Sequence, residues 1–543
     1  MPVMLRNRSP RGYGATAAAA AIVASSLLVL GCGTADTSAG SPEIEGTVLL
    51  PEAGSPFVAF DVWVQVGSQD DPEGKEGLAA LTAALLSDSG TTEHTYQELL
   101  EQLYPMATSY FAVTDKEMTT FRGVVHVDKL EEFYRLFRNA LLAPAFRQED
   151  FDRVKAQTMN YLENGRRFQR DEELSKELLF WRVYRGTSYA HPEEGYVQSV
   201  KALTLDDVKA FYRDHYLRNN LVVGIGGGYP TDFPQRARAD FDALPEGEVA
   251  RTPAPVPAMP EGVEVVLVEK DTDASAISFG YPIDVVRGED DYYELYLANT
   301  WLGDHRNSFS RLYQVIREKR GMNYGDYSYV EAFPLGFTTQ ERPVNVSRRS
   351  QIHEIWIRPI SLTNETDLHD RTLFAIRAAW RELEKLAENG LPREEVERTK
   401  TYLYNFAVTF GSTTLRRLAY AIDDAFYGME KDGFLAEVRP AVQAMTPEQV
   451  NAAIDEHFQA QNMVLVVITR DAEAFKKKLL SGEKTLISYA GEQPPEILAE
   501  DQEIATYPIP VKEEDIEILD ILEVFEGEAP AKAATPAEPT ESQ

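Results

Sequence analysis

Residues 203–223 read LTLDDVKAFYRDHYLRNNLVV, and residues 445–465 repeat the same plan as MTPEQVNAAIDEHFQAQNMVL. In each copy a threonine, Thr204 or Thr446, stands where an N-cap accepts hydrogen bonds from a first helical turn that carries acids. The helix then runs into an apolar strand, and the matched positions lie 242 residues apart. A second helix match, from residue 149 onward, has an offset of 245. Two matches in order at nearly the same offset predict a duplicated domain.

The elements of the first copy mix strands and helices instead of alternating strictly. An apolar run at residues 57–66 predicts a half-buried strand, and leucines at helical spacing from Leu78 predict a helix. Residues 110–127 read as two strands around a polar turn, and residues 129–142 as an amphipathic helix. This order predicts an α+β fold with two homologous halves, each a largely antiparallel sheet layered with helices.

Shifts in composition divide the chain. The two halves are expected at residues 45–245 and 262–480. A stretch with four prolines joins them at residues 246–261, which indicates a stiff linker. An acidic extension follows at residues 481–526 and contains two apolar segments suited to docking on the second half. The Ala/Pro/Glu-rich residues 527–543 are expected to be disordered.

The N-terminus has the pattern of an export signal. Three arginines precede an apolar run that ends at Val29-Leu30-Gly31-Cys32. Cys32 is the only cysteine, which excludes an internal disulfide, and it resembles the lipid-modified residue of bacterial lipoproteins. We therefore expect a signal peptide at residues 1–31, a tether at residues 32–44, and a lipid anchor in the membrane, with Gly33 favouring the outer membrane facing the periplasm. The alternatives are an uncleaved anchor helix and a buried free thiol.

The charge of the chain argues against a nucleic-acid partner. Its 87 acidic and 54 basic residues give a formal charge of −33. Cleavage of the signal removes three arginines and leaves 51 basic residues against 87 acidic ones, a net of −36. Such a surface repels phosphate backbones.

The order of these features resembles the pitrilysin/insulinase-type zinc peptidases, also called inverzincins. In the first half the match includes Val66-Gly67-Ser68, the sequence PEGKEGLA at residues 72–79, and Tyr189-Ala190-His191-Pro192. In the second half the strongest stretch is RLYQVIREKRGMNY at residues 311–324. The resemblance spans nearly all of residues 45–480. It implies a LuxS/metallopeptidase-like fold of the mitochondrial-processing-peptidase type.

Active members of that family carry H-x-x-E-H on the helix after the Gly-Leu-Ala signal, because positions i, i+3 and i+4 bring two histidines and a glutamate to one face. Here those positions are Ala80, Ala83 and Ala84, and neither H-x-x-E-H nor H-E-x-x-H occurs in the chain. Glu163 is the nearest counterpart of the third ligand. Alone it cannot hold zinc, and it reads better as a helix-surface carboxylate. No metal is therefore expected in this chain. Structural roles are expected for the remaining histidines of this half: His94, His126, His191 and His215.

The second half retains the other part of the family's active site. In active relatives an arginine and a tyrosine seven residues later contact the substrate backbone and stabilise the oxyanion, and the resemblance assigns these roles to Arg317 and Tyr324. A surface ion pair for Arg317 and a core position for Tyr324 are the alternative. Arg320 is expected to face solvent. The glycine run at residues 224–228 corresponds to a strand-end turn in the family, and its spacing does not match a dinucleotide loop.

The resemblance implies a non-catalytic subunit of a heterodimeric zinc peptidase. Some bacterial relatives divide the labour, with zinc in one subunit and the Arg/Tyr pair in its partner. Arg317 and Tyr324 would then complete the active site of a homologous zinc-bearing partner that cleaves peptides in the cell envelope. The alternatives are a stand-alone peptide-binding or scaffolding lipoprotein, and an active zinc metallopeptidase with unorthodox ligands.

Overall fold

The computed structural model describes residues 45–331, 343–359, 365–429, 433–485, 487–489 and 491–527. These residues belong to one compact unit. Cys32, the expected signal peptide and tether, and residues 528–543 lie outside the described residues. None of the helices found in the described ranges combines the length and the apolar character needed to cross a membrane.

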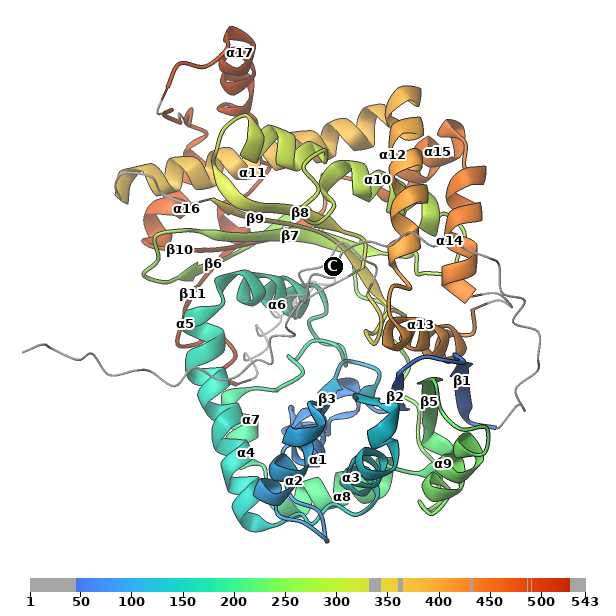
Figure 1. Cartoon of the computed structure of the whole chain (residues 1–543). Helices are drawn as coiled ribbons and strands as arrows, with labels where there is room; N and C mark the ends of the chain where they lie inside the picture. Colours follow the sequence, from blue (N-terminus) through green and yellow to red (C-terminus); the bar gives the residue numbers. More distant parts are fainter. Residues whose placement is uncertain are drawn as a thin grey trace, which may run out of the picture. The chain divides into compact units, whose positions relative to one another are not determined.

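The first sheet has five strands in the order β1-β5-β2-β4-β3 within the described residues (Figure 1). β1 runs parallel to β5, and the other neighbours are antiparallel. The strands are β1 (Thr47–Pro51), β2 (Phe57–Val64), β3 (Tyr110–Thr114), β4 (Thr119–His126) and β5 (Leu221–Gly227). The helices of this half are α1 (Leu78–Ser87), α2 (Tyr96–Leu103), α3 (Leu130–Leu142), α4 (Gln148–Asn160), α5 (Arg167–Gln169), α6 (Asp171–Val183), α7 (Val197–Ala202), α8 (Leu205–His215) and α9 (Phe233–Phe241). The predicted strands and helices of this half are confirmed.

The second sheet has six strands in the order β11-β6-β10-β7-β9-β8 in the same part of the chain. They are β6 (Val263–Glu269), β7 (Ala276–Ile283), β8 (Asn323–Tyr329), β9 (Gln351–Pro359), β10 (Met463–Thr469) and β11 (Ile516–Asp520). The helices are α10 (Tyr292–Gly303), α11 (Glu365–Asn389), α12 (Arg393–Phe406), α13 (Thr414–Tyr427), α14 (Gly433–Ala444), α15 (Pro447–His457), α16 (Ala472–Ser481) and α17 (Pro495–Ile504).

The two sheets have the same topology. β6, β10, β7, β9 and β8 take the places and directions of β1, β5, β2, β4 and β3, and β11 adds one parallel strand beside β6. The caps of the repeated helix also agree, because the hydroxyl of Thr204 accepts the N–H of Asp207 and that of Thr446 accepts the N–H of Gln449. The predicted α+β fold with two homologous halves is confirmed.

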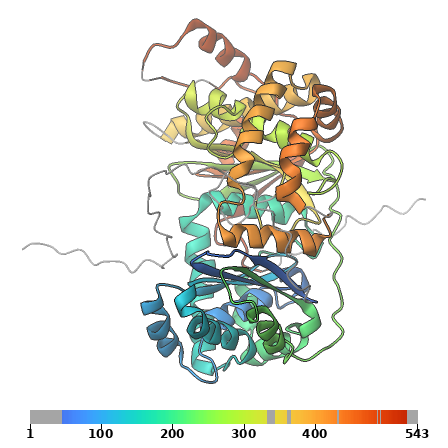
Figure 2. The same ribbon diagram turned by 45° about the vertical axis from the view of Figure 1, so that its right-hand side comes forward.

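One helix from each half packs against the sheet of the other half. Leu174 and Leu178 of α6 share a hydrophobic cluster with Val464 and Val466 of β10. Reciprocally, α13 packs its buried apolar side chains against β2 of the first sheet. The views in Figures 1 and 2 agree on this exchange, with α6 (teal) against the second sheet and α13 (orange) against the first. The two helices begin 243 residues apart, so they are equivalent elements of the duplication.

Only the end of the glycine run lies at the strand end, where Gly228 follows β5, so the expected strand-end turn is wrong for the earlier glycines. Gly224 and Gly226 lie inside β5. A Cβ at Gly224 would lie 2.2 Å from Cδ1 of Ile422, and a Cβ at Gly226 would lie 3.0 Å from Cγ2 of Thr414. The glycines therefore permit the close approach of α13 from the other half.

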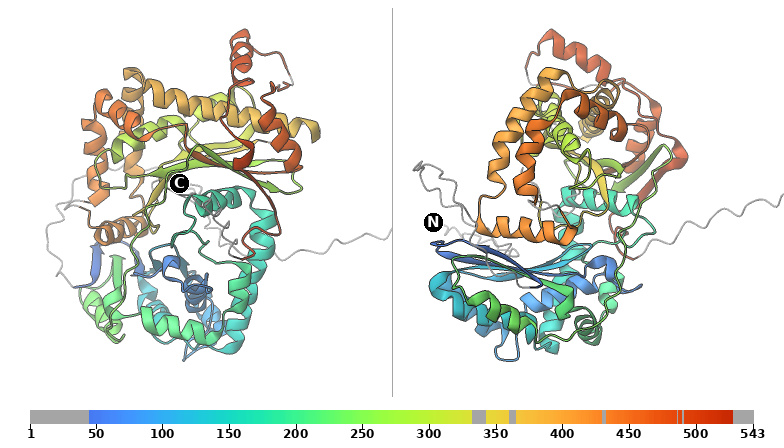
Figure 3. Two further views of the ribbon diagram at one scale, coloured as in Figure 1. Left: turned by 180° about the vertical axis from the view of Figure 1, so that it is seen from behind. Right: turned by 90° about the vertical axis from the view of Figure 1, so that its right-hand side faces the viewer.

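The C-terminal extension returns to the folded body after α16. Tyr507, Ile509 and Val511 pack, partly buried, against the core of the second half. Seen from behind, the extension (red) continues along the edge of the second sheet toward α5 and α6 (Figure 3). It is thus an integral part of the fold up to the last described residues.

Candidate functional site

Helix α1 carries the three alanines at the spacing of the family's metal-binding motif. Its N-terminus is held by the buried carboxylate of Asp71, whose two oxygens accept backbone N–H groups at 2.7 Å. Its leucines enter the core of the first half: Leu78, Leu81, Leu85 and Leu86. Ala83 is buried, whereas Ala80 and Ala84 are partly exposed. Because methyl groups offer no lone pair, these residues do not fit a zinc ion.

Glu163, the nearest counterpart of a third ligand, lies in the π-helix Tyr161–Arg166 that continues α4. Its side chain is exposed. A single exposed carboxylate is a weak metal ligand, and the position agrees with a helix-surface role.

Buried charges that the sequence analysis missed lie at the start of α1. Lys116, from the turn between β3 and β4, pairs with Glu193 at 2.9 Å, and both side chains are only 3% exposed. Arg166, also buried, pairs with Glu177 of α6 at 2.8 Å and with Glu194. In the sequence only the two adjacent acids at 193 and 194 hint at this cluster.

The loop that carries this cluster touches the metal-motif helix. A Cβ at Gly77, the residue before α1, would lie 2.5 Å from the carbonyl oxygen of Glu194. Burial raises the pKa of Glu177 to about 8, although Arg166 opposes the rise. Near the α1 N-terminus, Glu193 and Glu177 therefore each already lie against a cationic side chain.

Arg317 lies on the π-helix Tyr313–Glu318 and is partly buried. Its guanidinium carbon lies 4.8 Å from the centre of the Tyr313 ring, a cation–π contact. Asp326 of β8 is fully buried, which raises its pKa to about 8, and the positive charge of Arg317 opposes that rise. Arg317 thus contacts an aromatic ring, and its positive charge acts on a buried carboxyl group.

Tyr324 lies in β8, and its side chain is outside the described part of the structure. Its proposed cooperation with Arg317 stays a prediction. Arg320 was expected to face solvent, and this expectation is wrong. Arg320 is buried against α17 of the C-terminal extension. Its Nε donates to Asp501 at 2.8 Å and its Nη2 donates to Glu500 at 2.9 Å, and both acids lie on α17.

One group of side chains among the described residues offers metal-ligand atoms close together. Asp291, Glu456 and His457 place one such atom each within 4.8 Å of the others. Nε2 of His457 lies 3.3 Å from Oδ2 of Asp291. The group joins the start of α10 to the end of α15 in the second half, so it does not replace the motif lost from α1.

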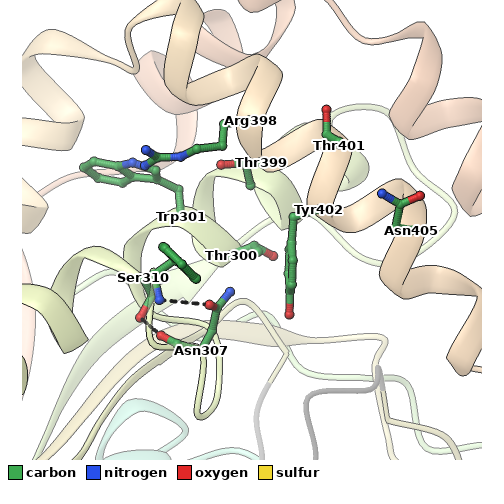
Figure 4. Close-up of a pocket in the computed structure, with 10 residues that line it drawn as sticks. Thr300, Trp301, Asn307, Ser310, Arg398, Thr399, Thr401, Tyr402 and Asn405 are labelled. Atoms are coloured by element: carbon green, nitrogen blue, oxygen red, sulfur yellow. Dashed lines mark hydrogen bonds between the residues drawn. The ribbon is translucent and has the colours of Figure 1, made fainter.

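A pocket of about 420 Å³ opens between α10, α12 and the loop after α10. Figure 4 shows the rings of Trp301 and Tyr402 at its wall. Nε1 of Trp301 donates to Glu395 at 3.0 Å, and Phe309 is 76% exposed at the rim. The full lining is Thr300, Trp301, Asn307, Phe309, Ser310, Arg398, Thr399, Thr401, Tyr402 and Asn405. The pocket adjoins in sequence the helix that carries Arg317, and no sequence pattern predicted it.

Two family models match the chain in tandem. The model of the insulinase family, peptidase M16, matches residues 47–192, and that of the peptidase M16 inactive domain matches residues 202–403. Together they cover more than half of the chain. The chain belongs to the insulinase family. The resemblance stated from the sequence is confirmed at this level.

Similar proteins carry contrasting names. An uncharacterized zinc protease of Streptomyces coelicolor is 25% identical over 366 residues, which are 65% of this chain and 72% of that protein. The non-peptidase homolog YmxG of Helicobacter pylori is 22% identical over 405 residues, 72% of this chain and 84% of that protein. The crystal structure of a peptidase M16 inactive domain from Pseudomonas fluorescens aligns with a TM-score of 0.67 and 22% identity over 78% of this chain and 95% of that chain. These likenesses support the insulinase-family fold, and activity has to be argued from the residues.

Proposed function

We propose that this insulinase-family chain is a non-catalytic subunit of a zinc peptidase. It binds peptide substrates and presents Arg317 and Tyr324 to the active site of a homologous, zinc-bearing partner. The observation that carries the proposal is the presence of Ala80, Ala83 and Ala84 at the motif positions of a well-formed helix α1. Zinc is expected in the partner and no cofactor in this chain.

Helix α1 has lost the side chains that could bind zinc but has kept its helical structure and its position. Alanine has the highest helix propensity, so the three substitutions preserve the helix while they remove every ligand atom. The buried cap from Asp71 preserves the position of the helix. A first half kept in this form still serves to shape a peptide-binding chamber.

The second half supplies groups suited to a developing negative charge. The Arg317 guanidinium presents N–H donors in a planar fork, and a phenol adds one more donor. Donors of this kind stabilise the oxyanion of a tetrahedral intermediate. We propose that they act across the subunit boundary, on a peptide held beside the partner's zinc.

We further propose that the mature chain is lipid-anchored through Cys32 in the outer membrane. The proposal rests on the basic and apolar segments before the only cysteine. It places the substrates among peptides of the periplasm.

The deciding experiment isolates the full chain from native membranes and measures the metal and peptidase activity that accompany it. We expect a co-purifying homologue with an intact H-x-x-E-H motif, which holds the zinc. In the reconstituted pair, Arg317→Ala should lower kcat by about 10²–10³, the usual effect of removing one oxyanion donor. Glu318→Gln is the matched control, because Glu318 is an exposed neighbour on the same turn.

Two outcomes would contradict the proposal. Partner activity that is unchanged without this chain favours a stand-alone peptide-binding lipoprotein. About one zinc per isolated chain favours a metallopeptidase with unorthodox ligands. In that case His457→Ala tests the cluster with Asp291 and Glu456, which provides the described ligand atoms for such a site.

A further inference from the structure

The C-terminal extension is bonded at one end to the second half. β11 pairs in parallel with β6, from Ile516 opposite Val265 to Asp520 opposite Glu269. Arg182 of α6 adds ion pairs to Glu264 of β6 at 2.8 Å and to Glu517 of β11 at 3.1 Å. This end of the extension is therefore fixed to the edge of the second sheet.

The other end, residues 524–526, is bonded to elements of the first half. Nε and Nη2 of Arg167 donate to the carbonyl oxygen of Val524 at 3.0 and 2.9 Å, and Nη2 also donates to the carboxylate of Glu526 at 2.8 Å. The first two N–H groups of α7 donate to the carbonyl oxygens of Phe525 and Glu526, at 3.0 and 2.8 Å. This segment was expected to dock on the second half, and its last residues do share a hydrophobic cluster with β6 and β10 of that half, but they also bond to the first half, which was not expected.

The receptor on the first half is built from groups that need a partner. Arg167 is only 4% exposed, and its guanidinium donates hydrogen bonds to Val524 and Glu526 of the extension. A buried cation without an acceptor is strongly unfavourable. The first N–H groups of a helix likewise have no partner within the helix, and here the extension supplies the acceptors for α7.

An aromatic slot completes the receptor. Phe525 is 6% exposed, and its ring meets Trp181 of α6 edge-on at 6.3 Å between centroids. The Tyr196 ring lies 6.4 Å away, and the guanidinium carbon of Arg166 lies 5.5 Å above the Phe525 ring. The receptor therefore fits a turn that presents an aliphatic residue, an aromatic residue and an acid in succession, with Phe525 in the left-handed backbone region.

We propose that residues 521–527 form a clasp that binds this receptor within the same chain and holds the two halves at a fixed separation. Residues 516–520 anchor the clasp to the second sheet, and residues 524–526 close it on the first half. The family models end at residue 403, so they do not include this device. The inference does not depend on the proposed partner or on any catalytic role.

Hydrogen exchange of the full chain, read by mass spectrometry, tests the clasp. We expect Phe525→Ala to raise the exchange rate of the Val197 and Gln198 amides at least tenfold. Leu522→Ala is the matched control, because Leu522 is 58% exposed on the same segment, and it should leave these amides unchanged. Arg167→Met should reproduce the effect of Phe525→Ala, whereas Arg170→Met, at an exposed arginine, should not.

Amides of β4, which lies away from the extension, report whether a variant unfolds as a whole. If the Arg167→Met variant shows faster exchange throughout the chain, it has unfolded as a whole and does not report on the clasp. The comparison of Phe525→Ala with Leu522→Ala then still tests the inference, because both changes lie within the clasp. Unchanged exchange at Val197 and Gln198 in Phe525→Ala would overturn the inference. Protection that falls when the wild-type protein is diluted would also overturn it, because the segment would then come from a second copy.

Discussion

Replacement of Gly224 by alanine tests how closely the exchanged helix α13 approaches the first sheet. Gly224 lies in β5, and its φ is not in the left-handed region, so alanine meets no backbone strain there. The added Cβ would lie 2.2 Å from Cδ1 of Ile422 and 2.7 Å from the carbonyl oxygen of Asp61. Normal carbon–carbon contact is about 3.5–4.0 Å. Ile422 is fully buried, so its side chain cannot turn out into solvent to relieve the contact.

The expected destabilisation of Gly224→Ala is about 1–3 kcal/mol, the range for overpacking a core. Ile422→Ala alone leaves a cavity and should cost about 2–5 kcal/mol. In the double variant the new methyl group occupies part of that cavity, so the double should be more stable than the sum of the singles predicts. We expect a coupling of at least about 1 kcal/mol.

The assay is denaturant unfolding of the wild type, both single variants and the double variant. Gly491→Ala is the control, because nothing lies within 4 Å of its added Cβ, and it should change stability by less than about 0.5 kcal/mol. Additive effects of Gly224→Ala and Ile422→Ala, within about 0.3–0.5 kcal/mol, would refute direct contact between α13 and β5.

Three further predictions concern buried polar groups. Lys116→Met leaves Glu193 buried without its cation and should lower the free energy of unfolding by about 3–5 kcal/mol, measured by denaturant titration. Trp63→Phe removes the 2.8 Å bond that Nε1 donates to Oδ1 of Asn345, so calorimetry should show a loss of stability of about 1–3 kcal/mol. Burial raises the pKa of Asp61 to about 7 from its usual 3.8, so its proton is held more tightly in the folded state, and the stability it contributes is lost as pH rises from about 4 to about 7. In Asp61→Asn the melting temperature should depend less on pH between about 4 and about 7 than it does in the wild type. A variant with the same pH dependence as the wild type would contradict a raised pKa for Asp61.

Local patterns were sufficient for much of the fold. Caps at Thr204 and Thr446 mark the same helix twice because capping depends on residues within one turn. The hairpin at residues 110–127 was visible from alternation around a polar turn, because strand register and turn type are also local. The repeat then predicted that both sheets share one topology.

Long-range contacts were the part that the sequence could not predict. The glycines in β5 looked like a turn because the helix that needs their missing side chains lies about 200 residues later. Arg320 looked solvent-exposed because its acidic partners, Glu500 and Asp501, come from an extension outside the repeat. The candidate site also has a part that the sequence predicted and a part that it did not. The alanines on α1 were evident from the motif spacing, whereas the ion pairs beside α1 join residues from separate elements of the chain and required the folded structure.

The stability of the first half bears on the functional proposal. Removal of a metal from a buried site leaves unpaired ligands, and a buried carboxylate without a partner is costly. Here the motif positions hold methyl groups and Glu163 faces solvent. The buried acids near α1 also have partners: Glu193 and Glu177 pair with Lys116 and Arg166, and Asp71 accepts two backbone N–H groups. Zinc would therefore add nothing that this half needs in order to fold. A first half that needs no metal in order to fold agrees with the proposal that the chemistry takes place on another subunit.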